Sequence, residues 1–324
     1  METSVKGPIC YQFKMLTDLW TGSVVIEEKD GKIKEKTVPD RLITTGLLGS
    51  IRWWFEVLVR GLGGYACDPT DTKCEGRNHC VVCELFGCTG WARKFRFEVL
   101  DEEGKVKKEQ IKKNDEFQLR FTPLRPICVE EWTLLDATLR LIAEYGAIGG
   151  KTVFKPTDVP SRSSKLHHKD FGLVQISTSQ QFDRADRRTL ETYLPKWRKL
   201  DHREFAWASL QHFWCVNGRY LGRRGNNNST FNQVLGRQEA KKQGQHLVHH
   251  NDGTTRWLAG SQRESKKVFS FKNPPRTFGF VKPGLIDLDT IKQRLQNVWG
   301  KDGWELLTEE RIIDQLFAKE EDRS

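Results

Sequence analysis

A cysteine-dense loop constrains this chain more than any other stretch. Five of the eight cysteines fall between residues 67 and 88, in the pattern Cys-x6-Cys-x5-Cys-x2-Cys-x4-Cys. The two-residue spacing of Cys80 and Cys83 lets two thiolates bind one tetrahedral zinc ion, with Cys67 and Cys74 completing the set. We therefore predict a structural zinc site at Cys67, Cys74, Cys80 and Cys83, because four cysteine ligands leave no open coordination position. A metal would replace the hydrophobic core that a short polar loop lacks.

Two other readings of the loop stay open. The cysteines could be free thiols on a mobile loop, or His79 could replace one cysteine as a ligand. The first residues contain no apolar segment typical of a secretion signal, and no apolar run approaches the roughly 20 residues that span a bilayer. We therefore expect a cytoplasmic protein, in which cysteines are thiols or metal ligands rather than disulfides.

Strands are predicted where apolar and polar residues alternate. This period of two runs through 11–16, 95–100 and 116–121 and is typical of half-buried strands. A further strand is expected over 171–177. A charged stretch with a turn signal at Asp30-Gly31 predicts a surface hairpin over 27–36.

Two helices are predicted between these strands. Residues 47–62 and 130–145 repeat apolar residues every three or four positions. Thr44 or Thr45 is expected to cap the first helix, and the second helix has two apolar faces, which indicates deep burial.

The order strand, helix, strand, strand, helix, strand is that of a ferredoxin-like α+β domain, a frequent platform for RNA-binding modules. It predicts such a domain over residues 1–180, with the cysteine-rich insertion at 64–90.

The second half, residues 181–324, is predicted to be helix-rich, with a second, degenerate ferredoxin-like domain as an alternative. Helices are expected over 200–214, 287–299 and 309–318. Residues 267–271 and 277–281 are expected to pair as strands.

Charge is distributed unevenly along the chain. The formal net charge is +10, yet residues 181–250 carry +7 while residues 301–324 carry −4. A basic middle indicates a polyanion partner, and an acidic tail indicates a protein neighbour. The polar stretch 226–253 between them is typical of a functional or disordered loop.

Four short motifs give the chain a family resemblance: Thr17-Asp-Leu-Trp-Thr-Gly22, Gly49-Ser-Ile-Arg-Trp-Trp-Phe55, Leu85-Phe-Gly87 and the glycine loop Gly146–Lys151. In these stretches, spread over residues 9–178, the chain resembles the RAMP superfamily of CRISPR effector subunits. Within it, the chain is most similar to the first-subunit group of the Cmr (type III-B) module. It departs from the family at Lys151-Thr-Val-Phe-Lys155, where relatives often carry arginines.

The resemblance implies a non-catalytic, RNA-binding subunit of a type III effector ribonucleoprotein that acts in antiviral defence. It implies assembly with other subunits of the effector complex near the 3′ region of the crRNA and contact with crRNA or target RNA, while a different subunit cuts the target. It also implies that Cys88 packs at the family's small-residue position after Phe86-Gly87.

RNA contacts are expected from basic residues on loops beside glycines and aromatics, because Lys and Arg bind phosphates and exposed aromatic rings stack on bases. For each residue alone, a solvated surface charge is an equal alternative, but the set favours RNA. The candidates are Arg52, Arg93, Lys94, Lys151, Lys155, Arg162, Lys165, Arg219, Arg223 and Arg224, with Trp20 as a stacking residue.

Catalysis is the less favoured alternative. A metal-independent RAMP endoribonuclease that processes repeat RNA would need a general base, and His167, His168, His202 and His212 are available. No hydrolase, metalloprotease or nucleotide-binding motif accompanies them. The histidines between 246 and 250 are expected at the surface. A zinc-containing DNA-binding regulator is a weaker idea, since no recognition helix is evident.

Overall fold

The structure is a computed structural model of the full chain. Within it, the fold is described for residues 7–29, 32–37, 40–68, 73–150, 156–200, 205–225, 228–237, 252–260 and 264–318. The chain divides into two compact units. The first contains Met1–Thr152, Phe171–Leu210 and Ile312–Ser324, and the second contains Val153–Asp170 and Gln211–Arg311. Residues 181–210 therefore pack with the first unit, and residues 153–170 with the second.

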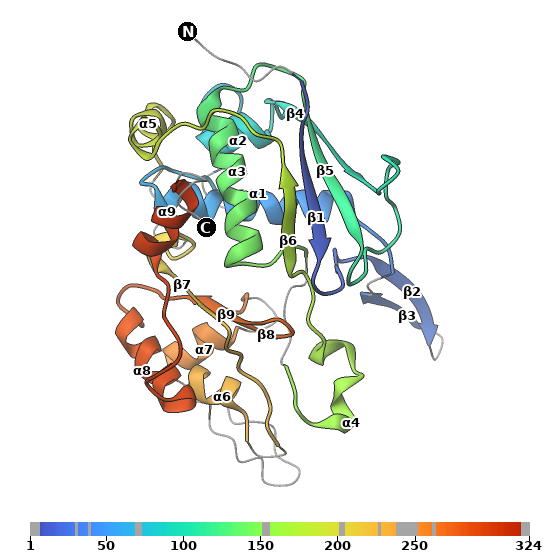
Figure 1. The fold of residues 1–324 in the computed structure, drawn as a ribbon, viewed down its shortest axis with the longest axis vertical. Coiled ribbons are helices and arrows are strands. Elements are labelled where there is room, and N and C mark those ends of the chain that lie inside the picture. Colours follow the sequence, from blue (N-terminus) through green and yellow to red (C-terminus); the bar gives the residue numbers. More distant parts are fainter. Residues whose placement is uncertain are drawn as a thin grey trace. The chain divides into compact units, whose positions relative to one another are not determined.

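The first unit is built on a four-stranded antiparallel sheet with two long helices (Figure 1). The order β4-β5-β1-β6 is that of a ferredoxin-like sheet, so the predicted arrangement is confirmed in this unit. Its elements are β1 (Ile9–Met15), α1 (Thr44–Gly61), β4 (Phe95–Leu100), β5 (Glu116–Pro123), α3 (Val129–Glu144) and β6 (Val174–Ser179).

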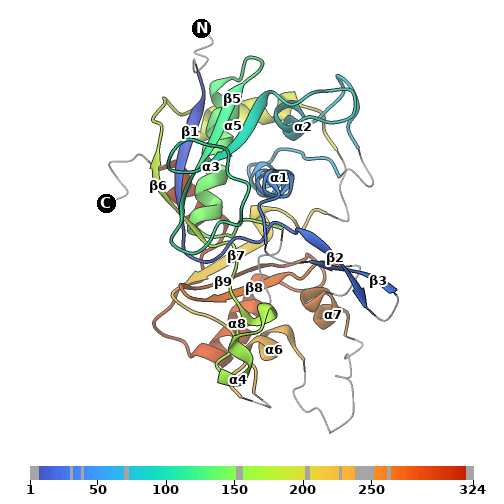
Figure 2. The same cartoon turned by 90° about the vertical axis from the view of Figure 1, so that its right-hand side faces the viewer.

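Alternation along the strands creates the core of this unit. In β1, every second residue is fully buried, as the period of two predicts. Phe13 lies opposite Phe117 of β5, and their rings stack with centroids 5.6 Å apart. Twelve of the 16 residues of α3 are buried, which confirms the deep burial that its two apolar faces indicate. Figure 2 shows α1 nearly end-on beside this layer.

The start of α1 corrects one prediction. The helix begins at Thr44 with Ile43 in the N-cap position, and no side chain caps it there. Instead, the hydroxyl of Thr21 accepts a hydrogen bond from the Ile43 amide at 2.7 Å. The loop after β1 therefore supports the helix start, a contact that neither Thr44 nor Thr45 makes.

Smaller elements complete the first unit. The predicted hairpin is confirmed as β2 (Val24–Lys29) and β3 (Lys32–Thr37), an antiparallel pair. The others are α2 (Val81–Phe86) in the cysteine loop, α5 (Arg187–Tyr193), η2 (Leu194–Lys196) and the apolar residues of α9 (Glu309–Phe317).

The second unit contains a three-stranded antiparallel sheet of order β7-β9-β8. The predicted strand pair and the two last helices are confirmed, whereas the helix expected over 200–214 is wrong. Residues 205–209 form turns, and a strand starts at Phe213, because the apolar run 213–216 is fully buried within a sheet. The elements are α4 (Pro160–Ser163), η1 (Leu166–His168), η3 (Leu210–His212), β7 (Phe213–Asn217), α6 (Thr230–Leu235), α7 (Gly253–Ala259), β8 (Val268–Lys272), β9 (Pro275–Phe280) and α8 (Leu288–Trp299).

The second sheet repeats the connectivity of the first. β7, β9 and β8 have the order of β1, β5 and β4, with helices before β8 and after β9. Where β6 pairs with β1 in the first unit, a single antiparallel bridge joins Leu307 to Cys215 of β7. The half predicted to be helix-rich is thus a mixed α and β unit. In the described part of the chain, no helix is long and apolar enough to cross a membrane.

Candidate metal centre and nucleic-acid interface

The four predicted zinc ligands come together in one buried cluster. The sulfur atoms of Cys67, Cys74, Cys80 and Cys83 all lie within 4.8 Å of one another. Cys80 precedes α2 and Cys83 lies in it, so a single helical turn brings both sulfurs to the same side. The sulfurs of Cys67 and Cys83 are 3.3 Å apart.

This geometry fits a tetrahedral zinc ion. A zinc–sulfur distance of about 2.3 Å separates ligand sulfurs by roughly 3.8 Å, which the cluster can accommodate with small shifts. Backbone amides already point at the sulfurs: Cys67 donates to the sulfur of Cys80 at 3.4 Å, and Cys80 donates to that of Cys74 at 3.2 Å. Such amide bonds to sulfur are typical of thiolate ligands.

The four cysteines of the cluster shift one another's pKa values. Hydrogen bonds from Cys67, Cys74 and Cys83 lower the pKa of Cys80. The pKa values of those three cysteines are raised, first by hydrogen bonds within the cluster and then by burial. Bound zinc would stabilise all four side chains as thiolates, which is its chemical contribution here.

Two arginines lie against the cluster. Arg52 donates to the sulfur of Cys83 at 3.3 Å and to the carbonyl of Gly87 at 2.9 Å, while Arg198 lies 3.6 Å from the sulfur of Cys74. Burial opposes the charge of Arg52, but Glu56 and Cys83 outweigh burial and raise its pKa. Four thiolates and a divalent cation carry a net charge of −2, and the two guanidinium groups offset it. Arg52, expected to contact RNA, therefore has a role beside the metal ligands.

The other two candidate ligands lie outside the cluster. His79 donates from Nδ1 to the carbonyl of Gly76 at 2.6 Å, and its Nε2 is hydrogen-bonded to the Glu84 carboxyl group at 2.7 Å. Cys88 is half-buried, and its thiol points to the carbonyl of Thr89. The four cysteines in the cluster are therefore the same four that the sequence spacing favours.

Glycine is required at the exit of the cysteine loop. Gly87 has φ of 86°, and a Cβ there would lie 2.8 Å from the amide nitrogen of Arg93 and 2.9 Å from the carbonyl oxygen of Trp91. The left-handed conformation and the close backbone approach both exclude a side chain. This explains the Leu85-Phe-Gly87 motif physically: it closes the loop after α2.

A buried charge network ties the cysteine loop to α3. Lys94 pairs with Glu84 of α2 and lies 2.8 Å from Glu131 in the first turn of α3. Glu131 is completely buried and also accepts a hydrogen bond from the amide of Cys128, closing a capping box. Burial opposes ionisation of Lys94, but Glu131 and Glu84 outweigh it and raise the pKa of the lysine. Lys94, another RNA candidate, is thus engaged within the protein.

The remaining candidates of the first unit differ in accessibility. Arg93 is exposed. Trp20 is only 4% exposed, and its ring packs edge-to-face on Phe171 with centroids 5.0 Å apart, so a base could stack on it only after a local rearrangement. Lys151 and Lys155 lie outside the described residues.

The glycine loop after α3 lies against the loop after β1. Gly150 donates from its amide to the carbonyl of Trp20 at 3.0 Å, and the amide of Gly149 donates to the hydroxyl oxygen of Ser50 at 3.0 Å. Gly149 has φ of 113°, and a Cβ there would lie 2.8 Å from the Trp20 carbonyl oxygen. Three of the four resemblance motifs therefore meet at this point: the loop ending at Gly22, the helix motif containing Ser50, and the glycine loop.

The five remaining candidates belong to the second unit. Arg162 and Lys165 are exposed on and beside α4, and the other three lie in the glycine-rich loop after β7. A short parallel bridge joins Thr157 to Arg223, with the amide of Arg223 donating to the carbonyl of Pro156 at 2.8 Å. The fold thereby brings two basic segments together that are separated by about 60 residues of sequence.

The loop after β7 corresponds to the loop after β1. Arg219 donates to the carbonyl of Gly303, in the loop after α8, at 3.2 Å, and the indole of Trp299 donates to the carbonyl of Tyr220 at 3.2 Å. The second unit thus packs its first-strand loop against its last-helix loop, as the first unit does. Sequence reasoning missed Tyr220, Asp158, Lys272 and Arg198, because only the fold brings them to these sites.

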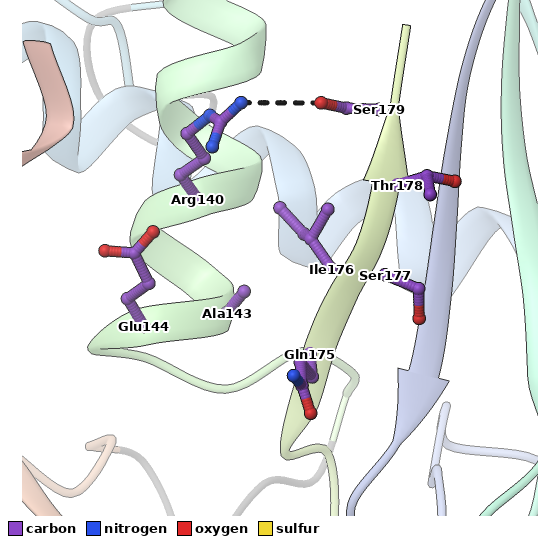
Figure 3. A pocket seen from close by; sticks show the side chains of 8 residues that line it. All are labelled: Arg140, Ala143, Glu144, Gln175, Ile176, Ser177, Thr178 and Ser179. Carbon is purple, nitrogen blue, oxygen red and sulfur yellow. Dashed lines mark hydrogen bonds between the residues drawn. The ribbon is translucent and has the colours of Figure 1, made fainter. Parts of the chain in front are cut away.

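A polar hollow of about 280 Å³ lies between α3 and the edge strand β6 (Figure 3). Arg140 reaches across it to the hydroxyl of Ser179 at 3.4 Å and also pairs with the buried Asp136 at 2.9 Å. Figure 3 shows Ile176 pointing toward α3 and Ser177 pointing away from it. The hollow holds no cluster of metal ligands or nucleophiles among the described residues.

Comparisons with known proteins relate part of the chain to one protein family. The model of the RAMP superfamily matches residues 12–154. A search of curated proteins finds no match. Among solved structures, apo Cmr1 from Pyrococcus furiosus is similar at 9% identity and a TM-score of 0.40, covering 96% of this chain and 97% of that chain. A chain of the Csm3–Csm4 subcomplex of a type III-A CRISPR-Cas interference complex is similar at 13% identity and a TM-score of 0.26, covering 60% of this chain and 97% of that chain. Because these two likenesses are weak, the family match is the informative comparison: residues 12–154, which contain α1, β4, β5 and α3 of the first unit, are similar to the RAMP superfamily.

Proposed function

We propose that this chain is a non-catalytic, RNA-binding subunit of a type III CRISPR effector ribonucleoprotein of the Cmr type. It contacts crRNA or target RNA near the 3′ region of the crRNA and assembles with other subunits of the complex. The observation that carries the proposal is the RAMP match over residues 12–154, which coincides with a ferredoxin-like sheet and a glycine loop seated on the loop after β1.

The basic surface of the second unit supports RNA as the partner. Arg162 and Lys165 are exposed, and the glycine-rich loop with Arg219, Arg223 and Arg224 is joined to their segment through the bridge at Thr157. Cations on loops next to glycines can reach phosphates without steric hindrance from neighbouring side chains. The phosphate contacts of the proposed subunit therefore come mainly from the second unit and from Arg93.

A structural role for the metal supports the non-catalytic part of the proposal. The four cysteines are all buried, and four thiolates saturate a tetrahedral zinc ion. Such a site offers no position for a water molecule or a substrate phosphate, which metal-dependent hydrolysis requires.

RNA binding is tested with the purified chain and a fluorescent single-stranded RNA at several salt concentrations. We expect binding that weakens as salt rises, with a slope of about 0.7 per phosphate contact. Arg162→Ala and Lys165→Ala should each lose about fourfold in affinity at about 0.15 M salt. Lys105→Ala, an exposed lysine paired with Glu103 in the β4–β5 loop, is the matched control and should bind as the wild type does. Absence of RNA binding at low salt, both alone and within the assembled complex, would refute the proposal.

A RAMP endoribonuclease is the second candidate, and one observation favours it. The rings of His167 and His168 lie 4.1 Å apart on an exposed segment. Burial, and then His168, Lys165 and Arg162, lower the pKa of His167, so its imidazole is neutral and able to accept a proton at pH 7. Burial also lowers the pKa of His212, while His202 lies outside the described residues. Labelled repeat RNA decides the matter: no cleavage by the wild type eliminates the enzyme, and cleavage lost in His167→Ala, His168→Ala, His202→Ala or His212→Ala would establish it.

A further inference from the structure

A single carboxylate in the second unit collects three side-chain donors. Asp158 Oδ1 accepts hydrogen bonds from the hydroxyl of Tyr220 at 2.8 Å and from the ammonium of Lys272 at 2.5 Å. Its Oδ2 accepts from the guanidinium of Arg224 at 2.6 Å. The guanidinium also lies over the Tyr220 ring, 4.5 Å from its centroid. Two cations and a phenol thus converge on one small anion.

The backbone beneath this group is held in place. The amide of Asp158 donates to the carbonyl of Arg223 at 2.8 Å, next to the bridge between Thr157 and Arg223. Nearby Asp170 has a different task, because it accepts the backbone amides of Lys272 and Asn273 at 2.9 and 3.0 Å. Asp158 binds side-chain cations through its carboxylate, so only its own side chain has to rotate to release them.

Asp158 lies in an otherwise basic, accessible neighbourhood. The side chains of Arg224, Lys272 and Asp158 are 37%, 36% and 24% exposed, so the group opens to solvent. Arg162 and Lys165 follow Asp158 on the same segment. Burial opposes ionisation of Asp158, but hydrogen bonds from Lys272, Tyr220 and Arg224 outweigh it and hold its pKa below the usual value. The carboxylate is thus ionised at neutral pH.

We propose that Arg224, Lys272 and Tyr220 form a phosphate-binding subsite for single-stranded RNA, which the Asp158 carboxylate occupies as an internal substitute until RNA displaces it. This inference rests on the proposed function. A phosphodiester group carries one negative charge on two unesterified oxygens, as a carboxylate does, and it accepts the same donors. Exchange of one for the other keeps the charge of the subsite balanced.

Competition by Asp158 sets the expected effect. Ion pairs that are open to solvent are weak, so RNA can replace them readily. While Asp158 remains ionised, however, it competes with phosphate for both cations and reduces the affinity of the subsite. Without its charge, each released cation adds about fourfold to the affinity for single-stranded RNA at about 0.15 M salt and about 0.7 to the salt slope.

The test compares Asp158→Asn with the wild-type full chain, using a fluorescent, unstructured single-stranded RNA over a series of salt concentrations. The asparagine is nearly isosteric and removes only the charge. We expect Asp158→Asn to bind RNA about four- to fifteenfold more tightly, with a steeper salt dependence. Adding Arg224→Ala or Lys272→Ala to this variant should abolish most of the gain. Glu305→Gln, which removes an exposed carboxylate of the same unit, is the control for net charge and should change little.

The outcomes separate this inference from the proposed function. If the wild type binds no RNA, both fail. If the wild type binds RNA and a folded Asp158→Asn binds no more tightly than Glu305→Gln, only the inference is overturned. Should Asp158→Asn not fold, acylation of Lys272 in the wild type replaces it as the test. RNA must protect Lys272 from the reagent, and equal labelling with and without RNA overturns the inference.

Discussion

Lys94 and Arg93 are neighbours in sequence with opposite environments. Both are basic residues at the start of β4, and both are RNA candidates from sequence. Lys94 is held between Glu84 and the fully buried Glu131, whereas Arg93 is exposed. At the scale of single residues, the role of a basic residue therefore cannot be inferred from its charge alone. Burial distinguishes a solvated cation from one that neutralises buried carboxylates.

Replacing Lys94 by Met should destabilise the first unit. The change leaves Glu131 and Glu84 without their common cation, and an unpaired buried charge costs about 3–5 kcal/mol. Arg93→Met is the matched control and should change the free energy of unfolding by less than about 0.5 kcal/mol. Denaturant unfolding of both variants measures the difference, and equal stability of the two would contradict the network.

Arg52 offers a second prediction at this scale. Because its guanidinium donates to the sulfur of Cys83, Arg52→Gln should weaken zinc affinity about 10–100-fold, the usual effect of losing a group that supports a metal ligand. Competition with a chromophoric chelator measures this affinity. Arg140→Gln, which removes a largely buried guanidinium that pairs with Asp136 on α3, is a control for the loss of a buried guanidinium. Unchanged zinc affinity in Arg52→Gln would return Arg52 to the RNA candidates.

Lys267 makes the stability of the second unit pH-dependent. Its side chain is 2% exposed, and burial lowers its pKa to about 8 from 10.5. Between these pH values the unfolded chain binds more protons than the folded one, so the free energy of unfolding rises with pH, by up to about 1.4 kcal/mol per pH unit. Below pH 8 Lys267 is protonated in both the folded and the unfolded state, so the full free-energy cost of burying its charge remains.

Comparison with Lys267→Met isolates this effect. The free energy of unfolding of the variant minus that of the wild type should fall as the pH rises from about 8 to 10.5, and be constant below pH 8. Chemical denaturation at a series of pH values gives this difference. A difference that does not vary with pH would show that Lys267 keeps its ordinary pKa.

At the scale of elements, we expect the cysteine loop to depend on a bound zinc ion. The loop contains one six-residue helix, whose Phe86 packs against Phe55 and Phe95 of the domain, and the four sulfurs and the Lys94 network hold the rest of the loop. The predicted zinc stoichiometry is one ion per chain by elemental analysis. Removing it with a chelator should lower the melting temperature, because metal binding contributes to the folding free energy.

Cysteine variants check the ligand set. Cys83→Ser should bind less zinc and melt at a lower temperature than the wild type, whereas Cys88→Ser should retain one zinc ion per chain, since its sulfur lies outside the cluster. A metal-free wild type that is fully folded would refute the site. Equal zinc content in Cys83→Ser and Cys88→Ser would refute this choice of ligands.

At the scale of the whole molecule, the two units do not follow the division at residue 180. Leu190 and Leu194 of residues 181–210, and Ile312, Ile313 and Leu316 near the end of the chain, are buried, and all belong to the first unit. Arg184 also pairs with the buried Asp136 of α3 at 3.0 Å. Two later segments of the chain, around Leu190 and around Ile312, thus complete the core of the first unit.

Truncation tests this arrangement. A fragment of residues 1–180 should be poorly soluble or melt well below the full chain, because it exposes apolar surface of α3 and leaves Asp136 without Arg184. A fragment of residues 1–210 restores α5, η2 and Arg184 and should be more stable. Circular dichroism melting of both compares them, and a stable 1–180 fragment would support the division expected from sequence.

Local patterns were enough to predict the first sheet and the four cysteines that come together in one cluster. Alternation along β1, β4 and β5 and the helical periodicity of α1 and α3 determine which residues are buried, since each depends on neighbours two to four positions away. The spacing of Cys80 and Cys83 determines their shared site in the same way. The apolar run 213–216 misled the prediction, because a fully buried strand and a buried helix have the same continuous apolar composition.

Only the tertiary structure decided what the charged residues do. Sequence alone identified a ferredoxin-like domain, the four cysteines that cluster in the fold and a set of basic residues. The fold then placed Arg52 beside Cys83, Lys94 between two carboxylates and Asp158 among three donors. Apart from the pair of Lys94 and Glu84, each of these contacts joins residues more than 30 positions apart. The free energy of a charge depends on its solvent exposure and its partners, and neither is encoded within the few neighbouring residues that a sequence pattern samples.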